Sequence, residues 1–159
     1  MTDLDAVRDA YLSLVDCHTV TAELLRKSSK GLTFHGTVFL SQPPDETKRL
    51  LVQAKMELDD WAIVGLVSTF ERILFKHDRS PLRSKPLRKR AEGLHDAIKP
   101  FEKLIARRTY EDVERLGDYR HWVAHGKRWE KSVHADPVSA YQQLVDFLTQ
   151  AGLETKAHD

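Results

Sequence analysis

Hydrophobic residues recur along most of this chain at spacings of three and four, the spacing of an amphipathic helix. No proline or glycine interrupts the pattern from Asp3 to Ser29, so the sequence predicts one long helix there. Its apolar side contains Leu4, Val7, Tyr11, Leu14, His18, Thr21 and Leu25. Since His18 lies within this stripe, we expect it to be a hydrogen-bonded core residue in preference to a ligand.

Residues 31–46 break the helical pattern, because apolar and polar residues alternate before two consecutive prolines. A short hairpin or an ordered loop fits this segment. The helical pattern resumes near Asp45 and continues to about His77. It contains the apolar run from Trp61 to Val67, which predicts a central element covered on all sides. A buried strand also fits this run, but its flanks are helix-forming and in phase, so we expect a long helix.

Residues 78–90 carry six basic side chains and no acid after Asp78. Pro81 and Pro86 disfavour a helix in the first part, and a solvated loop is the simplest interpretation. A third helix is expected next, and Pro100 predicts a kink or a break within it. Its apolar positions are Leu87, Ala91, Leu94, Ile98, Phe101 and Ile105. A basic stripe beside them consists of His95, Lys99, Lys103 and Arg107.

Two more helices complete the pattern. Residues 109–112 resemble a capping signal for a helix from Tyr110 to about His125, which Gly126 would end in a left-handed conformation. Asp136 and Pro137 suit the N-cap and the first position of a last helix. The apolar face of this last helix, which ends before Gly152, contains Val138, Tyr141, Leu144, Val145 and Leu148.

These elements predict an all-α protein. We expect one helical bundle of four to five helices over residues 1–153, followed by a frayed tail at residues 154–159. The composition agrees, since 41% of the 159 residues are hydrophobic, 31% are charged and only seven are glycine. A chain of this length is typical of a single domain with one core.

Charge and cysteine content narrow the function classes. The formal net charge of +1 excludes a chain-wide basic field of the kind that marks many nucleic-acid-binding proteins. Cys17 is the single cysteine, and its place on an apolar stripe predicts a buried thiol in preference to a nucleophile. The chain begins with acidic and polar residues, and no apolar run is long enough to span a bilayer. We therefore expect a cytoplasmic protein without a membrane partner.

Candidate chemistry is concentrated in DYRHWVAHGKRW, residues 118–129. His121 and His125 are four positions apart and share a helix face, the geometry in which two imidazoles can hold one zinc ion. Trp122 stands where a zinc-protease motif needs a glutamate, and no Cys/His cluster elsewhere has ligand spacing. We therefore expect neither a metal nor another cofactor. A simpler alternative places Trp122 in the core and the charges on an exposed helix end, where the helix dipole favours cations.

A third interpretation is acid–base chemistry on phosphate. Arg120 offers a planar fork of donors that matches phosphate oxygens, and His125 can exchange protons near neutral pH. Together they suit cleavage of RNA without a metal. Five positions separate them, about 140° around an ideal helix, so they flank an edge and do not share a face. Two copies packed across a two-fold axis could line one cleft, which predicts a homodimer.

Arg120, four intervening residues and His125, followed by Gly126, resemble the arginine-x4-histidine motif of the HEPN (higher eukaryote and prokaryote nucleotide-binding) superfamily. The context is similar too, with a long preceding helix that contains an apolar run and then Phe70-Glu71, and with a closing amphipathic helix. The resemblance spans most of the chain as architecture, although its specific residues are few. It implies a small helical bundle and, for many members, a metal-independent ribonuclease that dimerises with its motifs facing each other.

The resemblance also implies roles for single residues. Arg120 would stabilise the phosphate, His125 would act as acid or base, and His121 stands where the family usually has a small polar residue. Glu71 resembles an acidic residue that often supports the site, and a surface ion pair is an equal alternative for it. The implied function is an endoribonuclease, in a toxin or defence system with an antitoxin partner. The alternative is a HEPN-like module that binds RNA, nucleotide or protein without cleavage, or a scaffold whose motif serves dimer contacts.

RNA would be guided to the motif by basic side chains, through contacts that are sensitive to salt. Trp129 lies beyond the helix end and is the better candidate for stacking an unpaired base, since Trp122 is expected in the core. The expected RNA-binding basic residues are Lys127, Arg128, Arg88, Lys89, Arg90, Lys99 and Lys103.

Overall fold

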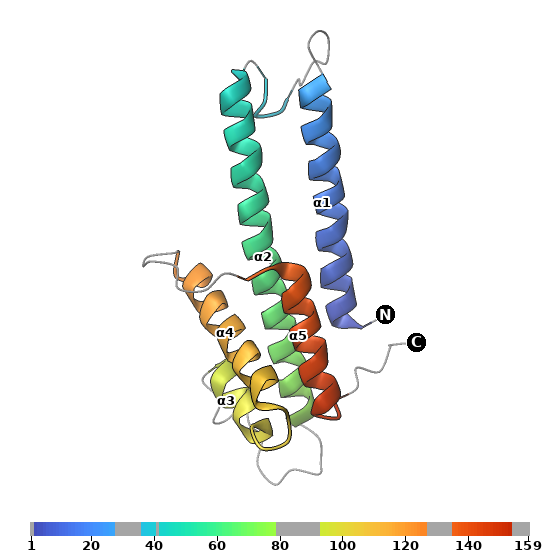
Figure 1. Cartoon of the computed structure of the whole chain (residues 1–159), viewed down its shortest axis with the longest axis vertical. Coiled ribbons are helices and arrows are strands. Elements are labelled where there is room, and N and C mark those ends of the chain that lie inside the picture. The colour runs from blue at the N-terminus through green and yellow to red at the C-terminus, as the bar shows by residue number, and fades with distance from the viewer. Residues whose placement is uncertain (1, 28–35, 41, 79–92, 127–134, 154–159) are drawn as a thin grey trace.

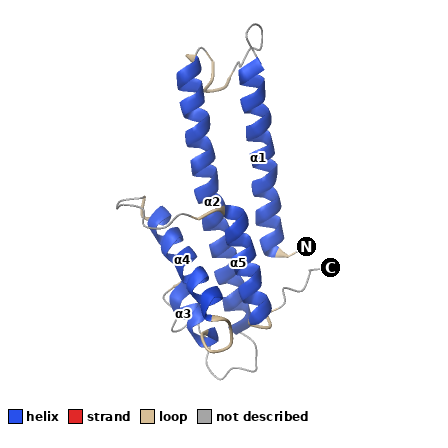
Figure 2. Ribbon diagram, viewed as in Figure 1, coloured by secondary structure: helices blue, strands red, loops and turns tan. Residues whose placement is uncertain are grey.

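A computed structural model of the chain describes residues 2–27, 36–40, 42–78, 93–126 and 135–153. Regular structure in these residues is helical throughout, without a strand (Figure 1, Figure 2). The predicted all-α fold is therefore confirmed. In chain order the elements are α1 (Asp3–Lys27), α2 (Pro44–Asp78), the short α3 (Leu94–Ile98), the 3-10 helix η2 (Lys99–Phe101), α4 (Arg107–Ala124) and α5 (Pro137–Gln150).

Two parts of the molecule share the long helix α2 (Figure 1). The first half of α2, Pro44–Asp59, lies antiparallel beside α1, and we call these two segments the arm. The second half, Asp60–Asp78, is packed against α3, α4 and α5, and we call these four segments the core bundle. The arm therefore extends beyond the bundle as a pair of helices.

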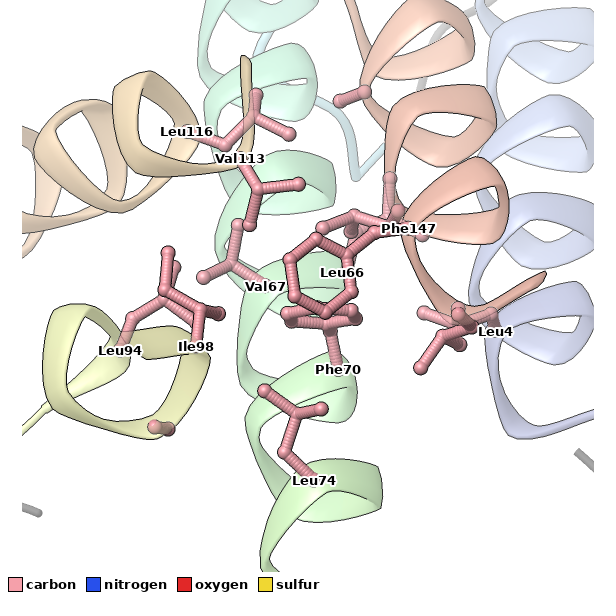
Figure 3. Packing of buried hydrophobic residues seen from close by; sticks show 14 of the residues in the cluster. Leu4, Leu66, Val67, Phe70, Leu74, Leu94, Ile98, Val113, Leu116 and Phe147 are labelled. Carbon is pink, nitrogen blue, oxygen red and sulfur yellow. The ribbon is translucent and has the colours of Figure 1, made fainter. Parts of the chain in front are cut away.

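The hydrophobic core is centred on two phenylalanines of the core bundle (Figure 3). Phe70 of α2 and Phe147 of α5 meet edge to face with ring centroids 5.2 Å apart, and the ring of Phe101 is 5.8 Å from that of Phe147. The other largest fully buried side chains are Leu4, Ile63, Leu66, Leu74, Ile98, Leu144, Val67 and Val113. This packing fixes α4, which carries the candidate motif, against the middle of the molecule.

Most helix ends agree with the sequence pattern, and one does not. α1, α2 and α5 closely match the predicted segments, and Asp136 caps α5 by accepting a hydrogen bond from the backbone N–H of Ser139 at 2.8 Å. The predicted capping signal for α4 is wrong, because the helix already begins at Arg107. Thr109 lies inside the helix, and its hydroxyl accepts a hydrogen bond from the Gln150 side chain at 3.0 Å.

The third predicted helix is much shorter than its apolar pattern suggests. Within the described residues α3 ends at Ile98, and the break that Pro100 predicts is present as the 3-10 turn η2. The basic stripe does not form along one helix, because Arg107 belongs to α4. Its first member, His95, faces α4 instead, with Nε2 3.1 Å from Oδ1 of Asp118. Residues 87–92 lie outside the described residues.

Several apolar side chains are more exposed than the pattern predicts. Trp61 is 68% exposed, so the run from Trp61 to Val67 is not covered on all sides, although Ile63, Leu66 and Val67 are buried. Cys17 is exposed, which contradicts the predicted buried thiol. Two residues assigned to apolar faces, Leu14 and Val138, are 52% and 51% exposed. For Cys17 and Leu14 the reason is that the arm is only two helices thick.

The segment between α1 and α2 and the side chain of His18 were also predicted from the sequence. Residues 36–40 form turns, residues 42–43 lead into α2, which already begins at Pro44, and residues 31–35 and 41 lie outside the described residues. His18 Nε2 is 3.0 Å from the carbonyl oxygen of Leu51, so the expected hydrogen-bonded histidine is confirmed. No described helix is long and apolar enough to cross a membrane.

Candidate functional site

The last turn of α4 carries the histidines of the motif. The backbone N–H of His125 donates to the carbonyl of His121 at 3.0 Å, and that of Gly126 donates to the carbonyl of Val123 at 3.0 Å. Gly126 has a φ of 72°, so the predicted left-handed end of this helix is confirmed. His125 is therefore held by backbone hydrogen bonds at a helix end, with its side chain exposed.

Arg120 lies one turn earlier and faces α2. Its Nη2 is 3.6 Å from Oε2 of Glu71, and the two side chains are 36% and 14% exposed. Arg120 Nε is buried and has no hydrogen-bond partner within the described part of the chain. Because a guanidinium has five N–H donors, this ion pair uses only part of the donor capacity of Arg120. The guanidinium is thus oriented by a carboxylate and still partly accessible to an anion.

A buried hydrogen bond beside Arg120 fixes α4 against α2. The hydroxyl of Tyr119 donates to Oδ1 of Asp60, which is 5% exposed. Burial, and next this hydrogen bond to a carboxylate, raise the pKa of the Tyr119 phenol. The ring centroid of Trp122 lies 5.7 Å from that of Tyr119. Trp122, which was expected in the core, packs against the core but is only half-buried. Since Tyr119 precedes Arg120, the hydrogen bond to Asp60 holds the part of α4 that carries Arg120 against α2.

Sequence reasoning did not find the Tyr119–Asp60 pair. Asp60 immediately precedes the apolar run that begins at Trp61. An acid in this position indicates an exposed residue at the end of an apolar run, not a buried one. The sequence offered no specific signal for the contact, because consecutive acids such as Asp59 and Asp60 are about 100° apart on a helix and can both face solvent.

His121 and His125 form an exposed pair on the outer side of α4. Their ring centroids are 4.2 Å apart with an interplanar angle of 58°. They could supply two nitrogen ligands, whereas a structural zinc site needs four. No group of three or more His, Cys, Asp or Glu side chains with metal-site geometry occurs among the residues that the structure describes.

Within one chain, Arg120 and His125 lie on different sides of α4. Arg120 contacts Glu71 of α2, whereas the ring of His125 lies against that of His121 on the exposed side. This agrees with their angular separation of about 140° on an ideal helix. One copy therefore places an oriented guanidinium and an exposed imidazole near the same helix end, but the two side chains do not face each other.

The other candidate RNA-binding residues divide into two groups. Lys99 and Lys103 are exposed near the start of α4, about 25 Å of helix away from His125. They do not adjoin the motif in one chain. Arg88, Lys89, Arg90, Lys127, Arg128 and Trp129 lie outside the described residues.

Comparison with models of protein families, with curated proteins and with solved structures finds no match for this chain. The motif and the contacts around it are therefore the features of this chain that bear on its function.

Proposed function

We propose that the protein is a metal-independent endoribonuclease that acts as a homodimer with a composite site of Arg120 and His125. The observation that supports the proposal best is the ion pair between Arg120 and Glu71, which orients a partly exposed guanidinium one turn from an exposed histidine. Arg120 would hold the non-bridging oxygens of a phosphodiester and stabilise the charge that grows on them. Glu71 would position Arg120 without contacting RNA.

The chemistry needs two proton-transfer groups on opposite sides of one phosphate. A neutral His125 would take the proton of a 2′-hydroxyl, and the 2′-oxygen would attack phosphorus. A protonated His125 of the second copy would give its proton to the 5′-oxygen as the bond from phosphorus to that oxygen breaks. The products are a 2′,3′-cyclic phosphate and a 5′-hydroxyl. One chain carries one His125 at this position, which is why the proposal requires two copies.

The resemblance of the motif to the HEPN superfamily is the second support, and it also suggests a role as a toxin or defence component with an antitoxin partner. The same exposed motif is compatible with a non-catalytic module that binds RNA, nucleotide or protein, because Arg120 and His125 do not meet within one chain. Activity and binding must therefore be measured separately.

The test uses the purified protein with structured and single-stranded RNA in an excess of chelator. We expect cleavage that yields cyclic phosphate ends, and losses of at least about 100-fold for Arg120→Ala and His125→Ala. His77→Ala, which removes an exposed histidine at the end of α2, is the control and should leave the rate unchanged.

Cleavage that survives both motif substitutions, or that the chelator abolishes, contradicts the proposed mechanism. RNA binding by the wild-type protein without any cleavage supports the non-catalytic module instead.

A further inference from the structure

An apolar groove of about 460 Å³ runs between α1 and α2, outside the candidate site. Most of its lining is apolar and includes Ala6, Ala10 and Leu14 of α1 and Leu58, Trp61 and Ala62 of α2. Asp3 and Arg72, which form an ion pair at 3.2 Å, also line it. Trp61 and Leu14, at its rim, are 68% and 52% exposed. Exposed apolar side chains that cluster in this way mark an interaction surface more often than those scattered singly.

The distribution of charge on α1 shows that the groove face is wider than contact with α2 requires. At about 100° per residue, every charged residue of α1 except Asp3 falls within an arc of about 100°. These residues are Asp5, Arg8, Asp9, Asp16, Glu23, Arg26 and Lys27. The remaining arc of about 260° contains one charged residue, Asp3, which lies on the groove side, whereas packing against one neighbour needs a stripe of about 100°. The part of it on the groove side contains Ala6, Ala10, Ser13, Leu14, Cys17 and Leu24.

The open side of α2 connects this groove with the candidate site. Trp61, Val64, Ser68 and Glu71 follow one another at spacings of three and four, so they form one row along the helix. None of the four is buried, and the row is about 15 Å long. It begins at the groove and ends at Glu71, the partner of Arg120. A body that covers both the groove and this row would reach the edge of the motif.

We propose that a second copy of this chain docks groove to groove across a two-fold axis, so that two arms form a four-helix contact beside the two motifs. The surface has the size that such a dimer needs. α1 is about 37 Å long and the arm is about 20 Å wide, which gives roughly 700 Å² per copy. A standard interface buries about 800 Å² per partner.

The shape of the groove also suits a copy of itself. Small residues at Ala6 and Ala10 lie beside the large Trp61 and Leu14, so a projection on one copy can enter a hollow on the other. This inference rests on the proposed function, because a composite site requires a second copy next to Arg120.

The test measures oligomeric state for the full chain by sedimentation equilibrium. We expect a wild-type dimer, and for Trp61→Glu a dissociation constant raised by at least about 100-fold. Met56→Glu is the matched control, because Met56 is also an exposed apolar residue of α2, at 61%, but lies on the opposite side of the helix from Trp61 and the groove. Far-ultraviolet circular dichroism should show the same helix content for all three proteins, since both substituted side chains are exposed.

Cys17 provides a readout that needs no further substitution. It is exposed in one copy and lies on the groove side of α1, so a dimer should slow its alkylation by iodoacetamide. As the protein concentration rises, the alkylation rate should fall for the wild type and for Met56→Glu. It should stay fast at every concentration for Trp61→Glu.

A Trp61→Glu variant that remains a dimer overturns the groove interface alone, whereas a monomeric wild type overturns both the interface and the composite site. If Trp61→Glu stays dimeric and RNA is still cleaved, the interface is wrong and the proposed function stands. If Trp61→Glu dissociates but the wild type cleaves no RNA, the interface stands and the ribonuclease proposal fails.

Discussion

The two halves of α2 have the same helical pattern and very different surroundings. In the core bundle the helix buries Ile63, Leu66, Val67, Phe70 and Leu74, whereas no side chain of Pro44–Asp59 in the arm is buried. α1 repeats the contrast, because its two buried residues, Leu4 and Tyr11, both lie near the end that meets the bundle. The core bundle can therefore fix Arg120 within one chain, and the arm leaves an apolar surface for another.

The largest difference between the two regions is expected for leucine truncations. Leu66→Ala removes a side chain that is 1% exposed and should lower the free energy of unfolding by about 2–5 kcal/mol. Leu14→Ala makes the same chemical change in the arm at a side chain that is 52% exposed, and should cost less than about 1 kcal/mol. Urea unfolding at low protein concentration measures both. Equal losses for the two variants would show that the arm is packed as tightly as the bundle.

The next difference concerns two neighbouring acids that each accept a hydrogen bond from a tyrosine. Tyr119→Phe removes a donor from Asp60 in the bundle and should cost about 1.5–3 kcal/mol, because that carboxylate is 5% exposed. Tyr11→Phe removes a donor from Asp59 at the base of the arm, where Lys55 Nζ remains 2.6 Å from Oδ1 of the same carboxylate. We expect about 0.5–1 kcal/mol there.

The two tyrosine variants also separate stability from function. Tyr119→Phe should slow RNA cleavage at a temperature where it stays folded, since its hydrogen bond to Asp60 holds the part of α4 that carries Arg120 against α2. Tyr11→Phe should not. A larger stability loss for Tyr11→Phe than for Tyr119→Phe contradicts this assignment of the buried acid.

The start of α1 fastens the arm to the bundle, and its contribution depends on pH. Asp5 accepts hydrogen bonds from the Tyr141 hydroxyl at 2.6 Å and from the backbone N–H of Thr2 at 2.7 Å. These bonds, the one from Tyr141 first, lower the pKa of Asp5 from 3.8 to about 2. Because the folded pKa is the lower one, this stabilisation is complete above pH 3.8 and is lost as the pH falls towards 2.

We therefore expect Asp5→Asn to cost no more than about 2 kcal/mol at pH 6, and less as the pH falls from 4 to 2. Urea unfolding at several pH values checks the prediction. Asp16→Asn, at an exposed position of α1, is the control and should keep the wild-type stability at pH 6. If Asp5→Asn and the wild type lose the same stability between pH 4 and 2, the carboxylate of Asp5 does not carry this linkage.

The contrast between arm and bundle also explains how much of the fold the sequence could predict. Spacing of apolar residues records which side of a helix is hydrophobic, so it correctly predicted α1, α2 and α5. It does not record how many neighbours cover that side, so Trp61, Cys17 and Leu14 were assigned to covered faces and are exposed. Pro100 predicted a break correctly, because its effect on the backbone is local.

In the candidate site, too, local features could be predicted from the sequence and contacts between helices could not. The turn at Gly126 and the exposure of His125 follow from local helix rules, and both could be read from the chain. The contact between Glu71 and Arg120 joins two helices, and only the resemblance had connected these residues in advance. The Tyr119–Asp60 contact had no such guide and was missed. The catalytic roles of Arg120 and His125 stay predictions.

The smallest expected effect compares two glycines with the same backbone strain in the two regions. Gly126 at the end of α4 has a φ of 72°, and Gly36 at the tip of the arm has a φ of 76°. A Cβ at either position would meet nothing within 4 Å, so alanine introduces only the cost of the left-handed backbone, about 1 kcal/mol.

For Gly126→Ala this cost falls on the turn that holds His125, so the last turn of α4 should fray and RNA cleavage should slow about fivefold. Gly36→Ala has the same local cost, but Gly36 lies in the turns between the two helices of the arm, so the substitution should leave cleavage unchanged. Cleavage rates and urea unfolding of the two variants test the comparison. Equal slowing by both substitutions means that cleavage follows overall stability and not the placement of His125. Slowing by Gly126→Ala alone ties the rate to the end of α4, because the strain is the same in both variants and only its location differs.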